Sequence, residues 1–182
     1  GHKPLTLVGG ATARIGDPSG KDKLRPFLDE ATLAHNIEGL KKSFRKFLKF
    51  GDGENDAVMV DNWDWFKDIN YLAFLRDIGT CYSVNRMLTM DSVKSRLERE
   101  QPMSFLEFNY MLLQGYDFCQ LLQKYNCRAQ IAGADQWGNI TSGTELGRRR
   151  YDTELFGFTS PILTDSSGKK MGKSEGNAVW IN

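Results

Sequence analysis

Short apolar runs alternate along the chain with longer segments whose apolar residues follow a helical spacing. Residues 4–9, 57–60 and 129–133 are short runs of this kind, next to glycine or polar residues, as is typical of buried strands. From Leu33 to Leu48, apolar residues recur on one face of a predicted helix. Strands that alternate with helices predict β-α-β units, a parallel sheet and an α/β fold.

Further helices are predicted after the second strand, over residues 69–79, 83–99 and 139–149. Asp91 is a candidate N-cap within the second of these helices. From Tyr151 onward the chain is predicted to be mostly loop, because turn-forming residues interrupt any periodic pattern. The sequence contains no internal repeat and no low-complexity stretch.

A capping box marks the start of one more helix. Residues 104–107 read Ser-Phe-Leu-Glu, the S-x-x-E pattern, and an apolar run follows them. The helix is expected to reach about residue 124, with Met111, Leu112 and Phe118 on its packing side.

Three polar residues share another face of this helix. Tyr110, Gln114 and Asp117 lie at i, i+4 and i+7, which places them in one row. Such a row is either a solvated stripe or the polar floor of a pocket. A phenol and a carboxylate together can hold an ammonium group or a substrate hydroxyl, and the pattern leaves both interpretations open.

The segments that follow the predicted strands carry the remaining candidate chemistry. Ligands of parallel sheets bind at the carboxyl ends of the strands. Residues 9–21, 61–65 and 133–138 occupy these positions and are rich in Gly, Asp, Asn, Gln or Trp. Within the last segment, Asp135 stands where acidic residues of nucleotide-binding folds hold a ribose diol.

Two glycine-containing loops carry lysines. Residues 16–21 read Gly-Asp-Pro-Ser-Gly-Lys, but their spacing fits neither the P-loop nor the dinucleotide fingerprint. A tight turn and a phosphate-binding loop both remain open there. Residues 169–174 read Lys-Lys-Met-Gly-Lys-Ser. They are either a solvated loop or a lysine clamp that neutralises charge on a departing phosphate.

Composition indicates a soluble globular protein. The chain has 182 residues, of which 40% are hydrophobic, and 24 basic against 23 acidic residues leave a formal net charge of +1. No apolar run reaches the roughly 18 residues of a membrane span, and no signal peptide is evident. Cys81, Cys119 and Cys127 are too widely spaced for a zinc site. We therefore expect free thiols in a reducing compartment and no metal site.

Four motifs, taken together and in order, resemble the tyrosyl-tRNA synthetases of bacterial type, which are class I aminoacyl-tRNA synthetases. Residues 170–174 resemble the KMSKS signature, with Gly172 in place of the middle serine. The other motifs are residues 9–21, 109–118 and 135–140. The resemblance covers essentially the whole chain. It implies a Rossmann-like (HUP-type) parallel sheet with helices on both faces and a helical connective insertion.

The resemblance implies a tyrosine site. Asp117 would contact the phenol of the substrate, and Tyr110 and Gln114 would face its ammonium group, as would Asp17. The residues that would line or support the same pocket are Thr12, Asn62, Trp65, Gln130 and Gln136.

The resemblance also implies an ATP site. Gly133 and Asp135 would hold the ribose of the adenylate. The residues that would engage the phosphates are Lys21, Arg25, Lys170 and Lys173, with Ser174 beside them. ATP would be a substrate that brings Mg²⁺ with it. Tyrosine would be activated to tyrosyl-adenylate and then transferred to tRNA(Tyr), through positioning and charge stabilisation rather than a protein nucleophile.

The sequence departs from the family pattern at its ends. Class I synthetases carry a HIGH-type signature after their first strand, whereas the histidines here, His2 and His35, lie in no such motif. The anticodon-binding and C-terminal RNA-binding parts are not found either. Residues 1–182 are therefore expected to form a partial catalytic domain with little activity on its own. Phe105 resembles a dimer contact, so a homodimer is implied for the longer protein, in a bacterial cytosol or, alternatively, an organellar matrix.

Two other functions stay open at this point. A tryptophanyl-tRNA synthetase would share the fold, although Asp117 and Tyr110 favour a phenolic substrate. A non-catalytic RNA-binding or splicing relative would also share the fold, although the pocket residues and lysines that it would not need are all present.

Overall fold

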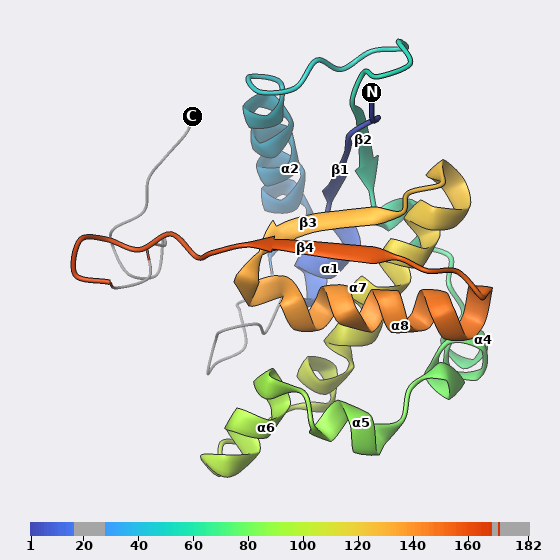
Figure 1. Cartoon of the computed structure of the whole chain (residues 1–182), viewed down its shortest axis with the longest axis vertical. Coiled ribbons are helices and arrows are strands. Elements are labelled where there is room, and N and C mark those ends of the chain that lie inside the picture. Colours follow the sequence, from blue (N-terminus) through green and yellow to red (C-terminus); the bar gives the residue numbers. More distant parts are fainter. Residues whose placement is uncertain (17–27, 169–170, 172–182) are drawn as a thin grey trace. The chain divides into compact units, whose positions relative to one another are not determined.

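In the computed structural model, which describes residues 1–16, 28–168 and 171, the chain forms two compact units (Figure 1). The N-terminal unit comprises the described residues up to Asp68, and the C-terminal unit comprises those from Ile69 onward. Each unit contains one pair of strands, and both pairs are parallel. The predicted α/β class with parallel strands is therefore confirmed.

The N-terminal unit is built on two parallel strands. Its elements are β1 (Leu5–Val8), α1 (Gly10–Ile15), α2 (Glu30–Phe44), β2 (Val58–Asp61) and α3 (Trp63–Phe66). Leu5 lies opposite Val58 and Val8 lies opposite Asp61, so the carboxyl ends of both strands lie at the same level. Val8, Val60 and Leu33 are almost completely buried and form the apolar interior of the unit.

Two segments of this unit that were expected to be loops are helical. α1 occupies most of the first half of the predicted glycine loop, and α3 begins at Trp63 inside the predicted loop 61–65. The first N–H groups of α1 are bound by the side chains of Asp61, which ends β2, and Asn62, which follows it, so the stabilising contacts come from distant parts of the chain. A local pattern cannot reveal such contacts. α2 also ends at Phe44, before the predicted Leu48, where the chain turns back on itself.

The C-terminal unit contains most of the helices. Its elements are α4 (Tyr71–Asp77), η1 (Gly79–Cys81), α5 (Val84–Leu88), α6 (Asp91–Glu98), α7 (Phe105–Tyr125), β3 (Ala129–Gly133), η2 (Ala134–Gln136), α8 (Trp137–Tyr151) and β4 (Phe156–Ser160). The predicted strand 129–133 and the predicted helices are confirmed. Asp91 is the first residue of α6 and not its N-cap, which is Met90.

Strand β4 was expected to be loop. It pairs in parallel with β3, from Ala129 opposite Phe156 to Gly133 opposite Ser160. Gly157 makes this strand possible, because a β-carbon at that position would lie 2.4 Å from the Ile140 side chain of α8. The strand therefore depends on close packing against α8. The sequence of the strand alone does not indicate this packing.

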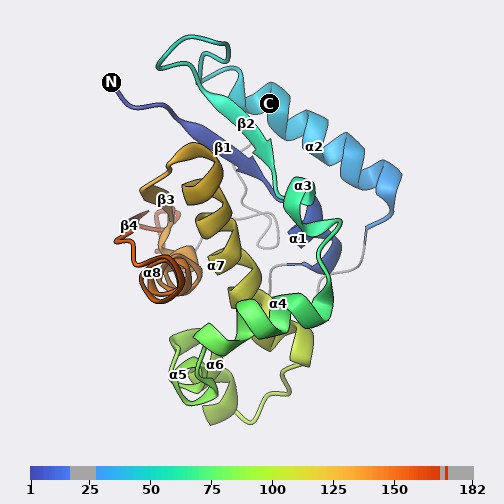
Figure 2. The same cartoon turned by 90° about the vertical axis from the view of Figure 1, so that its right-hand side faces the viewer.

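Helix α7 is the longest element, and it packs along α8. Figure 2 shows α8 end-on beside α7. Phe118 of α7 is 1% exposed and joins Ile140 and Leu155 in the apolar core of the unit. Gly143 of α8 allows this approach, since a β-carbon there would lie 2.9 Å from the Phe118 side chain.

The predicted capping box at the start of α7 is confirmed and carries a buried ion pair. Ser104 Oγ accepts the Glu107 backbone N–H, and Glu107 Oε2 accepts the Ser104 backbone N–H at 2.8 Å. The other carboxylate oxygen of Glu107 binds Arg96 Nη1 of α6 at 2.5 Å, and both side chains are less than 10% exposed. Burial favours a higher pKa for Glu107, but the hydrogen bonds from Ser104 and Arg96 outweigh it and lower the pKa below 4.5.

We expect Glu107→Ala to lower the free energy of unfolding by about 3–5 kcal/mol, because it removes the cap and leaves the Arg96 charge buried without its carboxylate. Chemical denaturation followed by circular dichroism measures this loss. A carboxyl group with a lowered pKa stabilises the fold above its unfolded pKa, and the stabilisation disappears as the pH falls through the folded value. Glu107→Gln should therefore flatten the decline of stability below about pH 4.5.

The matched control is Glu98→Gln, which removes an exposed partner of Lys94 at 3.7 Å. This variant should change stability by less than about 1 kcal/mol. Equal effects of the substitutions at Glu107 and Glu98 would contradict the structural role of the buried pair.

Candidate functional site

In the N-terminal unit, the predicted site residues gather at the carboxyl ends of the two strands. Asn62 directly follows β2 and is fully buried. Its Oδ1 accepts the Ala11 N–H at 2.7 Å, and its Nδ2 donates to Thr12 Oγ1 at 3.0 Å. Thr12 and Trp65 are also buried, at 8% and 9% exposure. The structure therefore brings Thr12 and Asn62 into direct contact and places Trp65 on the short helix that follows.

Arg14 and Trp63 form a second contact in this unit that the sequence analysis missed. The Arg14 guanidinium lies 3.8 Å from the centre of the Trp63 ring, a cation–π geometry. The same group pairs with Glu30 of α2 and donates to the Gly10 carbonyl of its own helix. Arg14 and Glu30 are 16 residues apart, and no regular spacing signals their pairing.

In the C-terminal unit, the polar row of α7 is buried and is not a solvated stripe. Asp117 is 3% exposed and Tyr110 is 6% exposed, while Gln114 between them is partly buried. A carboxylate that is removed from water to this degree is costly unless hydrogen-bond donors surround it. This row thus presents a buried carboxylate and a buried phenol on one face of α7.

The remaining predicted residues of this unit lie on β3 and in the turn that follows it. Gln130 is on the strand, Gly133 ends it, and Asp135 and Gln136 form the turn η2 that leads into α8. Gln136 Oε1 accepts a hydrogen bond from Asn139 at 3.0 Å. Asp135 is exposed.

Two observations relate β3 and the turn after it to a ligand. The Gln130 side-chain oxygen is buried without a hydrogen-bond partner among the described residues, and such groups are usually satisfied by water or a ligand. A β-carbon on Gly133 would lie 2.8 Å from the Asp135 carboxylate, so glycine leaves room for that carboxylate beside the strand. Ala132 of β3 packs against the same core cluster as Phe118, which fixes this end of the strand relative to the Asp117 row.

Six predicted residues lie outside the described part of the chain. They are Asp17, Lys21, Arg25, Lys170, Lys173 and Ser174. Their assignment to the ammonium and phosphate groups stays a prediction.

A buried hydrogen-bond network behind α7 was also missed by the sequence analysis. Ser142 of α8 is fully buried, and its Oγ lies 3.0 Å from both the Met111 carbonyl and the Tyr82 hydroxyl. The Tyr82 hydroxyl in turn donates to the Ser142 carbonyl at 3.2 Å. Burial raises the pKa of Tyr82, so this phenol stays protonated. Because Tyr82 and Ser142 are 60 residues apart, only the folded chain shows their link.

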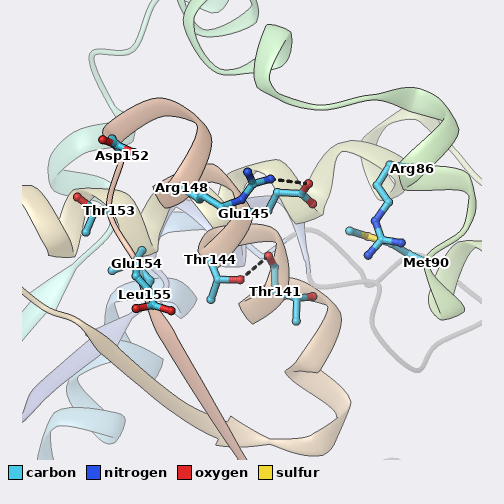
Figure 3. Close-up of a pocket in the computed structure, with 10 residues that line it drawn as sticks. All are labelled: Arg86, Met90, Thr141, Thr144, Glu145, Arg148, Asp152, Thr153, Glu154 and Leu155. Carbon is cyan, nitrogen blue, oxygen red and sulfur yellow. Dashed lines mark hydrogen bonds and ion pairs between the residues drawn. The ribbon is translucent and has the colours of Figure 1, made fainter.

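One cavity of the C-terminal unit, about 600 Å³, is not lined by any of the predicted residues (Figure 3). Two arginines and three carboxylates are among its lining residues, and Arg148 lies 3.9 Å from Glu145. A second cavity of about 30 Å³, enough for roughly one water, is lined by Tyr110, Asn139 and the Arg96–Glu107 pair. Of the predicted tyrosine-site residues, only Tyr110 lines the second cavity.

The described residues contain no cluster of three or more His, Cys, Asp or Glu side chains that could hold a metal ion. Within the same residues, no helix is long and apolar enough to cross a membrane. All three cysteines are free thiols. Burial raises the pKa of Cys119 to about 12 and also raises that of Cys127.

Comparison with known families and curated proteins gives a consistent result. Residues 1–182 match the sequence model described as tRNA synthetases class I (W and Y). Proteins named tyrosine–tRNA ligase from Rickettsia bellii and Cereibacter sphaeroides are 59% and 57% identical over 182 residues. Each alignment covers 100% of this chain but 44% of the relative, so the chain spans less than half of their length.

Solved structures give the same fold. The mitochondrial tyrosyl-tRNA synthetase of Aspergillus nidulans superposes with a TM-score of 0.79 at 31% identity, covering 94% of this chain and 55% of that chain. The corresponding enzyme of Coccidioides posadasii gives 0.73 at 31% identity, covering 92% and 52%. A tryptophanyl-tRNA synthetase from Campylobacter jejuni gives a TM-score of 0.62 at 14% identity, covering 97% of this chain and 51% of that chain. This is a likeness of fold alone.

The cysteine environments predict a pattern of chemical reactivity. In the native chain, iodoacetamide at pH 8 should modify Cys119 far more slowly than Cys81 or Cys127, because Cys119 is fully buried and its thiol stays protonated. Peptide mapping by mass spectrometry resolves the three sites. In denaturant the three rates should become equal, which is the internal control. Rapid native labelling of Cys119 would contradict the described packing of α7 against α8.

Proposed function

Because the chain belongs to the class I tRNA synthetases of the tryptophan and tyrosine family, we propose that it is part of the catalytic domain of a tyrosine–tRNA ligase. In the first step, the carboxylate of tyrosine attacks the α-phosphorus of ATP and pyrophosphate leaves. In the second step, the tyrosyl group passes from the adenylate to the 3′-terminal ribose of tRNA(Tyr). Both steps need oriented substrates and stabilised charge rather than a protein nucleophile.

The observation that carries this proposal is the burial of Asp117, at 3% exposure, in one row with Tyr110 on α7. A tyrosine phenol can donate a hydrogen bond to the Asp117 carboxylate. Phenylalanine cannot donate this bond, so a site that accepts it would bind phenylalanine more weakly than tyrosine. A buried carboxylate therefore suits the selection of tyrosine over phenylalanine.

The ammonium group of the substrate would be bound by Tyr110 and Gln114, with Asp17 beside them. The buried oxygen of Gln130 supports this arrangement, because it has no partner among the described residues and would accept a hydrogen bond from a ligand. Gln136, Thr12, Asn62 and Trp65 would line or support the pocket. Of these, Asn62 holds Thr12 in place through its side-chain amide.

ATP would bind at the end of β3, where Gly133 leaves room and Asp135 would accept hydrogen bonds from the ribose hydroxyls. The cations proposed to stabilise the phosphates in the transition state are Lys21, Arg25, Lys170 and Lys173, with Ser174 beside them. Lysine suits this role because it presents a compact charge on a long side chain. Mg²⁺ would arrive with ATP as part of the substrate.

The remaining partners follow from the same proposal. Phe105, the first residue of α7, is 67% exposed, which suits the homodimer contact implied for the longer protein. The longer protein would supply the HIGH-type segment and the parts that bind tRNA, and it would act in a bacterial cytosol or an organellar matrix.

Two rival functions are less well supported. Tryptophanyl-tRNA synthetases share the fold, but the structural likeness to one of them has only 14% identity, against 31% for the tyrosyl enzymes. A non-catalytic RNA-binding relative would not need a buried carboxylate beside a buried phenol. Tyrosine binding measured by calorimetry separates this last function from an enzyme, because an RNA-binding protein should show none.

The decisive experiment is amino-acid-dependent pyrophosphate exchange by the full-length protein. We expect ATP to incorporate labelled pyrophosphate when tyrosine is present and to show far less incorporation with tryptophan or phenylalanine. A reaction without added amino acid is the control. Preference for tryptophan, or no exchange with any amino acid, would contradict the proposed function.

A further inference from the structure

We propose that Asp61 is the positioning residue of the N-terminal unit, because one of its carboxylate oxygens holds the segments that carry Thr12, Asn62 and Trp65. This inference rests on the proposed function, in which those three residues line or support the tyrosine pocket. Asp61 itself need not touch the substrate, and it is not among the individual site residues that the sequence predicts.

Helix α1 is capped from outside its own sequence. A helix begins with N–H groups that have no partner within the helix. Gly9, at the N-cap position of α1, provides no side chain for them. Asp61 Oδ1 accepts the Gly10 N–H at 3.0 Å, and the next residue, Asn62, accepts the Ala11 N–H at 2.7 Å. The end of β2 therefore caps the helix that follows β1.

The same oxygen of Asp61 makes a second hydrogen bond, to the start of α3. Asp61 Oδ1 also accepts the Trp63 N–H at 2.9 Å, which starts α3 two residues later. α3 carries Trp65, and α1 carries Thr12. A single acceptor thus fixes the starts of two short helices at the carboxyl ends of two paired strands. Short helices have little stability of their own, so their orientation depends on such contacts.

The space around Gly10 leaves no room for a side chain. A β-carbon at this position would lie 2.2 Å from Asp61 Oδ1, closer than any real contact. Glycine is therefore required for the carboxylate to reach the backbone. Arg14 Nη1 binds the Gly10 carbonyl at 2.5 Å, so both polar groups of this residue are held. In both of its hydrogen bonds to these backbone amides, Asp61 serves as an oxygen acceptor.

The test uses the full-length protein, three variants and one control variant. Asp61→Ala removes the acceptor and should raise the KM for tyrosine by about tenfold, while kcat changes less. Asp61→Asn keeps an oxygen in the same place and should restore the KM to within about twofold of the wild-type value. Gly10→Ala displaces the carboxylate and should raise the KM in the same way as Asp61→Ala. Asp64→Ala, which alters an exposed carboxylate of the same segment, is the matched control.

Amide hydrogen exchange of Gly10 and Trp63 provides a readout that does not depend on activity. Both amides should lose protection in Asp61→Ala and keep it in Asp61→Asn. An unchanged KM and unchanged protection in Asp61→Ala would overturn the inference, and so would an Asp61→Asn variant as impaired as Asp61→Ala. If wild-type protein shows no tyrosine-dependent exchange of pyrophosphate, the proposed function fails, while the hydrogen-exchange comparison still decides whether Asp61 holds the two helices.

Discussion

The close packing of α7 against α8 is the contact on which the C-terminal unit depends. Gly143 allows the two helices to approach, and Phe118, Ile140 and Leu155 seal the interface. Burial of these apolar side chains fixes which face of α7 lies against α8. The polar row of α7, with Asp117 and Tyr110, is then held out of water in a fixed orientation. Recognition of a hydroxyl by a buried carboxylate requires this rigidity, since a mobile helix would let water replace the ligand.

In the N-terminal unit the corresponding constraint is the satisfaction of buried backbone groups. The strands β1 and β2 end at the same level, and each is followed at once by a short helix. Asp61 and Asn62 bind the first N–H groups of α1, so residues of one strand end orient the helix after the other. In both units, then, side chains proposed to meet the substrate are oriented by contacts between segments far apart in the sequence.

The sequence predicts the elements whose pattern is local. The capping box at Ser104 and Glu107 marks the start of α7, and the apolar run 129–133 is strand β3. Strand β4 and helices α1 and α3 are not predicted from the sequence. The strand packs closely against Ile140 of α8, and Asp61 and Asn62 bind the first N–H groups of the helices. For the site, the spacing of Tyr110 and Asp117 indicates a shared face but not its burial. The family resemblance supplies the roles of the lysines, which lie outside the described residues.

Asp117 is the group proposed to select tyrosine. Equilibrium binding of tyrosine and phenylalanine to the full-length protein, measured by calorimetry for wild type and Asp117→Asn, tests this point most directly. We expect the wild-type protein to prefer tyrosine strongly and the variant to lose most of that preference, because the amide replaces a charged acceptor. An Asp117→Asn variant that binds tyrosine and still rejects phenylalanine as well as the wild type would contradict the account.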